Sequence, residues 1–169
     1  MENMNFTLFL NEDLIFVGKS FNNAEESITF LSNKLFEKGY TKEGFLEAVL
    51  KREQKFPTGL YLGNINVAIP HTDTKFANKS GLAIAVLQNP VKFRRMDNPT
   101  EEIPVHIIFL LVIVEPDEYV RFLSKLTSAF GDQKFLAQVF SSEKPQFVYT
   151  LMSQIINPVK ERKFSIYED

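Results

Sequence analysis

Two histidines are the only imidazoles in this 169-residue sequence, which contains no cysteine. His71 follows the apolar residues 67–69 and Pro70. An apolar run that ends in proline predicts a strand that stops at a loop, because proline cannot donate to a sheet ladder. Loops at strand ends commonly present reactive side chains. An imidazole with an ordinary pKa of about 6.5 is largely neutral at neutral pH, and its ring nitrogen can attack phosphorus without a separate strong base.

Further motifs stand in a fixed order around this histidine. They are Arg52-Glu53, Phe56-Pro57-Thr58-Gly59, Val67-Ala68-Ile69-Pro70-His71 and a later apolar run, residues 104–111, that carries His106. This arrangement resembles the IIA phosphocarrier domains of the bacterial sugar phosphotransferase system (PTS), in the fructose–mannitol branch called EIIA type 2. The resemblance covers roughly residues 20–152 and is specific because several elements fall in the right order with the right gaps.

Two positions depart from the pattern that is common in this family. Asn66-Val67 replaces a Gly-Ile pair, and Pro57 stands where serine is usual. The Phe-Pro-Thr-Gly form looks most like the galactitol-type members. These departures bear on the sugar that the system transports more than on the chemistry.

The resemblance implies a phosphotransferase component that needs no cofactor and uses no nucleotide directly. His71 would accept a phosphoryl group from the phosphohistidine of HPr and pass it to the EIIB component of a sugar permease. Arg52 would stabilise the phosphoryl oxygens, since a guanidinium is always charged and matches them in a fork. His106 would serve as an auxiliary histidine near the phosphoryl group, and Thr58 and Gly59 would contact the phosphate.

Each of the secondary residues also has a structural interpretation. Arg52 can be a cation favoured by the dipole at a helix C-terminus. His106 can be a polar core group bonded to backbone. Thr58 and Gly59 can simply form a turn. For partner docking, the sequence suggests an apolar rim that includes Phe76, Tyr61 and Leu62.

Three other functions compete with the phosphocarrier as interpretations of this sequence. The first is a regulatory binding module, like the nitrogen-related IIA proteins, whose partner changes when His71 is phosphorylated. The second is a metal-dependent hydrolase built on His71, Asp73 and His106, but these residues lack the close ligand spacing of common zinc motifs, so no metal site is expected. The third is catalysis with ATP, which is disfavoured because the seven glycines form no phosphate-binding loop.

Composition bounds the class of protein. The length suits one domain, residues 1–169, with a core over about 6–157 and a loose tail over 158–169. The net charge of −2, with scattered basic residues, argues against nucleic acid as a partner. The absence of cysteine, of a signal-peptide pattern and of any apolar run long enough to span or insert into a bilayer indicates a cytoplasmic protein.

Apolar periodicity predicts an α/β fold, with a mixed β-sheet of about five strands sandwiched between helices on both faces. The sequence predicts strands over residues 6–10, 14–17, 61–62, 67–69, 82–87 and 105–114. Helices are expected over residues 23–38, with Asn23 as the cap, 41–52, with Thr41 as the cap, 117–130, 133–140 and 144–156. Residues 89–104, which contain three prolines, are expected to form an exposed loop.

Overall fold

A computed structural model describes residues 6–156 and contains one five-stranded sheet, with strand order β1-β4-β5-β3-β2. The strands are β1 Ile15–Lys19, β2 Gly59–Leu60, β3 Val67–Ala68, β4 Gly81–Arg94 and β5 Glu102–Val112. β1 runs parallel to β4, and β3 runs parallel to β5, whereas β4 pairs antiparallel with β5 and β2 with β3. The sheet is therefore mixed, as predicted.

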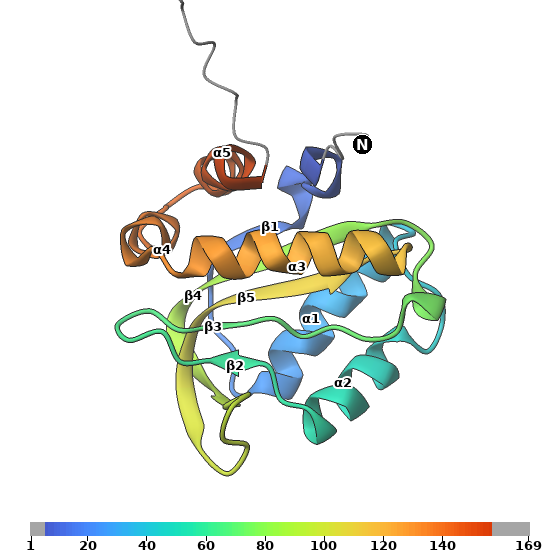
Figure 1. Cartoon of the computed structure of the whole chain (residues 1–169), viewed down its shortest axis with the longest axis horizontal. Helices are drawn as coiled ribbons and strands as arrows, with labels where there is room; N and C mark the ends of the chain where they lie inside the picture. Colours follow the sequence, from blue (N-terminus) through green and yellow to red (C-terminus); the bar gives the residue numbers. More distant parts are fainter. Residues whose placement is uncertain (1–5, 157–169) are drawn as a thin grey trace, which may run out of the picture.

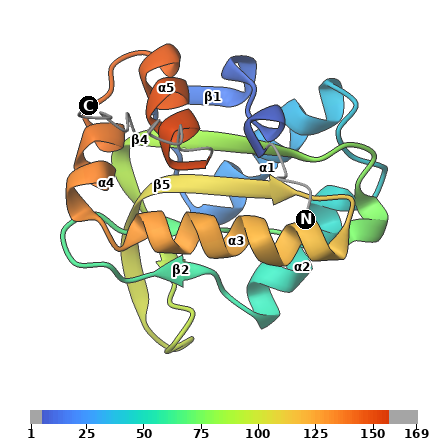
Figure 2. The same ribbon diagram turned by 45° about the horizontal axis from the view of Figure 1, so that its top comes forward.

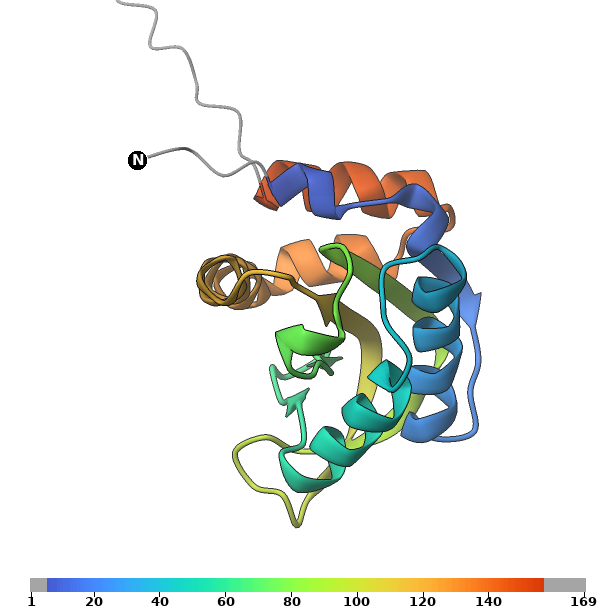
Figure 3. The same cartoon turned by 90° about the vertical axis from the view of Figure 1, so that its right-hand side faces the viewer.

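Helices cover both faces of this sheet (Figures 1 and 3). One face packs against α1 Ala24–Glu37 and α2 Phe45–Lys55. The other packs against α3 Pro116–Phe130, α4 Gln133–Phe140 and α5 Pro145–Ile156. The predicted fold class is confirmed, and α3 lies along β5 (Figure 2).

Alternation along β4 explains why its apolar run has no polar face. Leu82, Ile84 and Val86 point into the cluster with α3–α5, whereas Ala83 and Ala85 point into the cluster with α1 and α2. Successive side chains of a strand point to opposite faces, so a strand covered on both sides is apolar at every position.

Helix α1 begins as predicted, and helix α2 does not. The side chain of Asn23 accepts a hydrogen bond of 2.8 Å from the backbone N–H of Glu26. The prediction that Thr41 caps α2 is wrong: Gly44 is the N-cap residue, and Thr41 instead pairs with Ala77 in an isolated bridge. Gly44 has φ +89°, a conformation that glycine adopts without steric cost.

Three other element predictions need correction. Residues 6–10 are not a strand, because Phe6–Phe9 form a 3₁₀ turn, which is followed by a second one at Glu12–Leu14. The short strand expected at residues 61–62 lies two residues earlier, as β2. Residues 89–104 are mostly strand: β4 continues to Arg94 after an irregularity between Val86 and Val91, and β5 already begins at Glu102.

The extension of β4 has a visible cause. Gln88, Asn89 and Pro90 are exposed, and Val91, Lys92 and Phe93 then alternate buried, exposed and buried. At this irregularity residues 87–90 of β4 lie opposite the single residue 106 of β5, and pairing with β5 resumes beyond Pro90, which cannot donate to the ladder. The loop itself shrinks to residues 95–101.

Helix α3 packs with a face rotated from the predicted one. The spacing of Val120, Leu123, Leu126 and Thr127 predicts that they share the apolar face, but the side chain of Val120 is 69% exposed. Phe122, Leu126, Ala129 and Phe130 are the buried residues of this helix. Within residues 6–156, no helix combines the length and the apolar character needed to cross a membrane. The tail predicted over residues 158–169 lies outside the described residues.

Candidate active site

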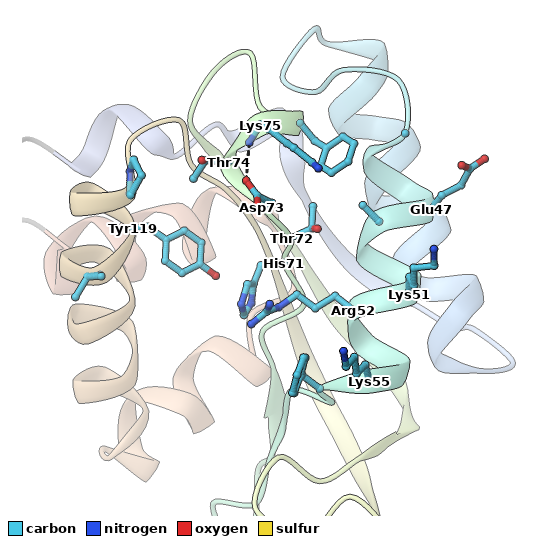
Figure 4. A pocket seen from close by; sticks show the side chains of 16 residues that line it. Glu47, Lys51, Arg52, Lys55, His71, Thr72, Asp73, Thr74, Lys75 and Tyr119 are labelled. Atoms are coloured by element: carbon cyan, nitrogen blue, oxygen red, sulfur yellow. Dashed lines mark hydrogen bonds between the residues drawn. The ribbon is translucent and has the colours of Figure 1, made fainter.

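His71 lies in a cavity of about 1070 Å³ between α2, the segment 71–76 and the start of α3. Figure 4 shows it between Arg52, which reaches over from α2, and Tyr119, which reaches over from α3. Basic side chains outnumber acidic ones in the lining: Lys51, Arg52, Lys55 and Lys75 against Glu47 and Asp73. A concave site with excess positive charge attracts anions.

Hydrogen bonds of the backbone hold His71 at the end of β3. The carbonyl of Pro70 accepts from the N–H of Leu111 in β5 at 3.2 Å, and the N–H of Ile69 donates to the carbonyl of Thr58 at 3.4 Å. The chain leaves the sheet directly after Pro70, as the proline predicts. His71 is therefore presented from a rigid strand end.

The imidazole of His71 is fixed in one tautomer. Its Nδ1 lies 2.8 Å from the carbonyl oxygen of Ile69. A carbonyl can only accept, so Nδ1 must carry the proton, and the lone pair is then on Nε2. The arrangement makes Nε2 the nucleophilic nitrogen.

Burial keeps this ring neutral. Desolvation lowers the pKa of His71 below its ordinary 6.5, the hydrogen bond to Ile69 raises it in part, and the positive charge of Arg52 lowers it further. A neutral ring retains the lone pair that attack on phosphorus requires. The electrostatics of the cavity therefore favour the reactive form.

Arg52 is available to bind an anion. Its side chain is exposed, its guanidinium lies 5.4 Å from the centre of the Phe56 ring, and within residues 6–156 it forms neither an ion pair nor a hydrogen bond. Figure 4 shows the guanidinium beside His71. The structure thus brings together His71 and Arg52, as the sequence suggested.

His106 lies at the other end of the strand pair, away from His71. The parallel register pairs Val67 with Ile107 and Ala68 with Ile108, so His106 falls about five residues before the point in β5 that faces His71. At about 3.3 Å per residue, that is roughly 16 Å. Its ring packs 5.4 Å from that of Phe140 and is absent from the lining of the His71 cavity.

A reciprocal pair of bonds with Asn66 satisfies His106. The backbone N–H of Asn66 donates to Nδ1 of His106 at 3.1 Å, and the N–H of His106 donates to the carbonyl of Asn66 at 2.9 Å. The expectation of an auxiliary histidine at the phosphoryl group is not supported, and the alternative of a polar group bonded to backbone fits. The same separation removes the hydrolase site of His71, Asp73 and His106. The described residues hold no group of three potential metal ligands.

Thr58 and Gly59 do not line the cavity either. Both the N–H and the hydroxyl of Thr58 donate to the carboxylate of Glu53, each at 2.8 Å, and Thr58 is only 2% exposed. A Cβ on Gly59 would lie 2.6 Å from the carbonyl oxygen of Arg94. These residues therefore shape the approach of β2 to the end of β4, and the phosphate contact expected of them is not supported.

Tyr119 is the site residue that the sequence interpretation missed. Its ring centre lies 5.2 Å from that of His71, with 58° between the ring planes. It lies 48 positions further along the chain and belongs to no motif, so its only sequence signal is its place in the first turns of an amphipathic helix that follows a strand.

The apolar rim differs in part from the expected one. Phe76 lines the cavity as expected. Tyr61 is exposed but lies elsewhere, 4.8 Å below the guanidinium of Arg95, and Leu62 packs against the core. Phe56 and Val120, which are 54% and 69% exposed, flank the opening instead.

Comparisons with known proteins bear on the family and the fold of this chain. Residues 8–155 match the family described as "Phosphoenolpyruvate-dependent sugar phosphotransferase system, EIIA 2". The galactitol-specific EIIA component of Escherichia coli K12 is 27% identical over 154 residues, which cover 91% of each chain. The multiphosphoryl transfer protein of Escherichia coli O6:H1 is 32% identical over 140 residues, covering 82% of this chain but only 16% of that longer protein.

The fold recurs in solved structures. A chain in the complex of enzyme IIAMTL and phosphorylated enzyme IIBMTL from Escherichia coli superposes with a TM-score of 0.70. The match covers 85% of this chain and 96% of that one at 22% identity, which shows a shared fold.

Proposed function

This chain belongs to the EIIA type-2 family of the phosphoenolpyruvate-dependent sugar phosphotransferase system, and we propose that it carries the phosphoryl group on Nε2 of His71. EIIA components are phosphotransferase proteins that transfer the group through a histidine. One observation carries the assignment to His71. Of the two histidines, only His71 lies in the cavity with its Nε2 lone pair free to attack. Arg52, which forms no ion pair within residues 6–156, lines the same cavity.

The geometry supports direct transfer from one imidazole to another. The lone pair on Nε2 attacks phosphorus while the donor N–P bond breaks and its electron pair returns to the donor nitrogen. The Nδ1 proton stays in its bond to the carbonyl of Ile69, which stabilises the positive charge that the ring gains. Arg52 neutralises charge on the phosphoryl oxygens, and such transfer depends on positioning and electrostatics.

We propose phospho-HPr as the donor and the EIIB component of a sugar permease as the acceptor. A chain in the solved complex of IIAMTL with phosphorylated IIBMTL has the same fold as this chain, which supports EIIB as the acceptor. The exposed side chains of Phe56 and Val120 beside the cavity offer an apolar contact for transient docking. The proposed carrier comprises one EIIA domain over residues 1–169, and no described feature favours the regulatory alternative.

Phosphorylation in vitro tests the assignment. Purified protein would be incubated with phosphoenolpyruvate, enzyme I and HPr, and acid-labile, alkali-stable phosphate would be measured. Wild type and His106→Gln are expected to take up label, and His71→Ala is not. His106→Gln is the matched control because it changes the only other histidine and keeps a side-chain acceptor for Asn66.

Two results would contradict the proposal. Label on His71→Ala would place the phosphoryl group on another residue. Failure of wild type to label, with HPr itself labelled in the same tube, would remove the carrier function altogether.

A further inference from the structure

The hydroxyl of Tyr119 is buried in the cavity wall and has no hydrogen-bond partner among the described residues. A tyrosine hydroxyl that is taken out of water usually finds a partner, since leaving a buried polar group without a hydrogen bond destabilises the protein. The chain shows the ordinary arrangement at Tyr40, which is 4% exposed and accepts from Nδ2 of Asn11 at 3.3 Å. The hydroxyl of Tyr119 is thus an exception, and a bound ligand could supply its missing hydrogen-bond partner.

Its surroundings identify the class of ligand. Figure 4 shows the hydroxyl of Tyr119 pointing toward His71 from α3, on the side opposite the helix that carries Arg52. The hydroxyl makes no hydrogen bond to Nε2 of His71, whose Nδ1 is occupied by Ile69, and the guanidinium of Arg52 can only donate. A group that enters between the three residues must bring acceptor oxygens.

We propose that Tyr119 binds the phosphoryl group, donating its hydroxyl hydrogen to one phosphoryl oxygen while Arg52 binds another. This inference rests on the proposed carrier role of His71. The phosphoryl group on Nε2 supplies three strong acceptor oxygens, so one of them can satisfy a donor that has no partner in the unphosphorylated protein. Tyr119 contacts the transferred group and is in that sense a catalytic residue.

The charge state of the tyrosine suits this role. Burial raises the pKa of the Tyr119 hydroxyl, and the positive charge of Arg52 lowers it only in part. The hydroxyl therefore stays protonated at every working pH and can donate. A phenolate at this place would repel the phosphoryl oxygens.

The arrangement makes the two states of the carrier unequal. The unphosphorylated protein contains a buried donor without a partner, and phosphorylation supplies one. Tyr119 should therefore shift the exchange equilibrium with the donor toward phospho-His71 and slow hydrolysis of the N–P bond. A tyrosine with a purely structural role would affect both states alike.

The test compares Tyr119→Phe, which removes only the hydroxyl, with wild type and with Tyr149→Phe. Tyr149 is the matched control, because it is a half-buried tyrosine on α5, which does not line the cavity. The phosphorylated fraction at equilibrium with phospho-HPr and the half-life of phospho-His71 would be measured. Melting temperatures would be recorded for the phosphorylated and the unphosphorylated protein. The ³¹P resonance of the phosphohistidine would be compared between wild type and the variants.

Tyr119→Phe is expected to shift the equilibrium about ten-fold toward the unphosphorylated form and to shorten the half-life. The unphosphorylated Tyr119→Phe protein should melt no lower than unphosphorylated wild type, since the lost hydroxyl had no partner. The gain in melting temperature on phosphorylation should shrink, and the ³¹P resonance should move. Tyr149→Phe should match wild type in the equilibrium, the half-life and the ³¹P resonance.

If Tyr119→Phe labels on His71 with the equilibrium, half-life and ³¹P resonance of wild type, the tyrosine inference is overturned and the carrier function stands. A loss of melting temperature that is equal in both states would also overturn it, because it would indicate packing alone. If wild type takes up no label while HPr does, the carrier function fails, and the tyrosine inference fails with it.

Discussion

Glu53 accepts both hydrogen bonds that Thr58 can donate, one from the backbone N–H and one from the hydroxyl, each at 2.8 Å. Burial raises the pKa of the Glu53 carboxyl, whereas the two bonds from Thr58 lower it in part. The two residues of the motif Arg52-Glu53 thus have different roles. The arginine faces the cavity, and the glutamate fixes the segment that leads into β2.

Removal of Glu53 should destabilise the fold. Glu53→Ala leaves a buried N–H and a buried hydroxyl unsatisfied, and it is expected to lower the free energy of unfolding by about 2–4 kcal/mol. Urea unfolding would measure this, with the exposed neighbour Gln54→Ala as control. A double-mutant cycle with Thr58→Val should show coupling of about 1 kcal/mol. Strict additivity would mean that the two residues act independently.

Arg52 should govern the rate of phosphoryl transfer and leave the fold intact. Arg52→Gln removes the charge next to the transferred group, and the rate is expected to fall by about 10²-fold or more. Arg52→Lys keeps the charge without the two-pronged geometry and should recover part of the loss. Rapid-quench labelling from phospho-HPr would measure both. Equal rates for the glutamine variant and wild type would contradict this role and leave Arg52 only as a cation favoured by the dipole at the C-terminus of α2.

His71 should titrate below the ordinary histidine pKa. Burial and Arg52 lower its pKa from 6.5, so the ring loses reactivity only at a more acidic pH. An NMR titration of the ring protons would show a midpoint below 6.5, and Arg52→Gln should move that midpoint upward. A midpoint at or above 6.5 would contradict the desolvated site.

The same burial has a consequence for stability. Desolvation lowers the pKa of both His71 and His106, so just below pH 6.5 the unfolded chain binds more protons than the folded one. The contribution of these two histidines to the free energy of unfolding should therefore be complete above pH 6.5 and be lost as the pH falls below 6.5. Denaturant curves at several pH values would measure this slope. His71→Gln, which cannot titrate there, should reduce it, and an unchanged slope would assign it to other groups.

His106 should matter for stability and not for transfer. His106→Ala leaves the backbone N–H of Asn66 without its acceptor, and a loss of about 1–3 kcal/mol in unfolding free energy is expected. Label uptake on His71 should keep the wild-type rate, because the two histidines lie at opposite ends of the strand pair. A variant that folds as wild type but transfers slowly would restore the auxiliary role.

Val120 should contribute to partner docking. Its side chain is 69% exposed at the edge of the cavity, and a carboxylate there would be desolvated by a docked protein. Val120→Asp is expected to raise the KM for phospho-HPr roughly ten-fold, which corresponds to about 1.4 kcal/mol, with kcat little changed. Phe147→Asp, at an exposed position on α5 outside the cavity, is the matched control. Equal KM values for the two variants would place the docking surface elsewhere.

The sequence by itself determined the layered fold and the core of the site. Runs that are apolar at every position, such as residues 82–87, require cover on both faces of the sheet. Proline before His71 ended its strand, and the order of the motifs linked the histidine to Arg52. The first two signals are local, since each depends on residues that are neighbours in the chain, whereas the link to Arg52 depends on the family resemblance.

Tertiary structure alone decided which other side chains reach His71. The register of β3 against β5 placed His106 at the far end and paired it with Asn66, although the two residues are 40 positions apart. The turn from β5 into α3 brought Tyr119 to the ring of His71. Register and helix rotation are set by packing among distant segments, and no window of sequence contains both partners.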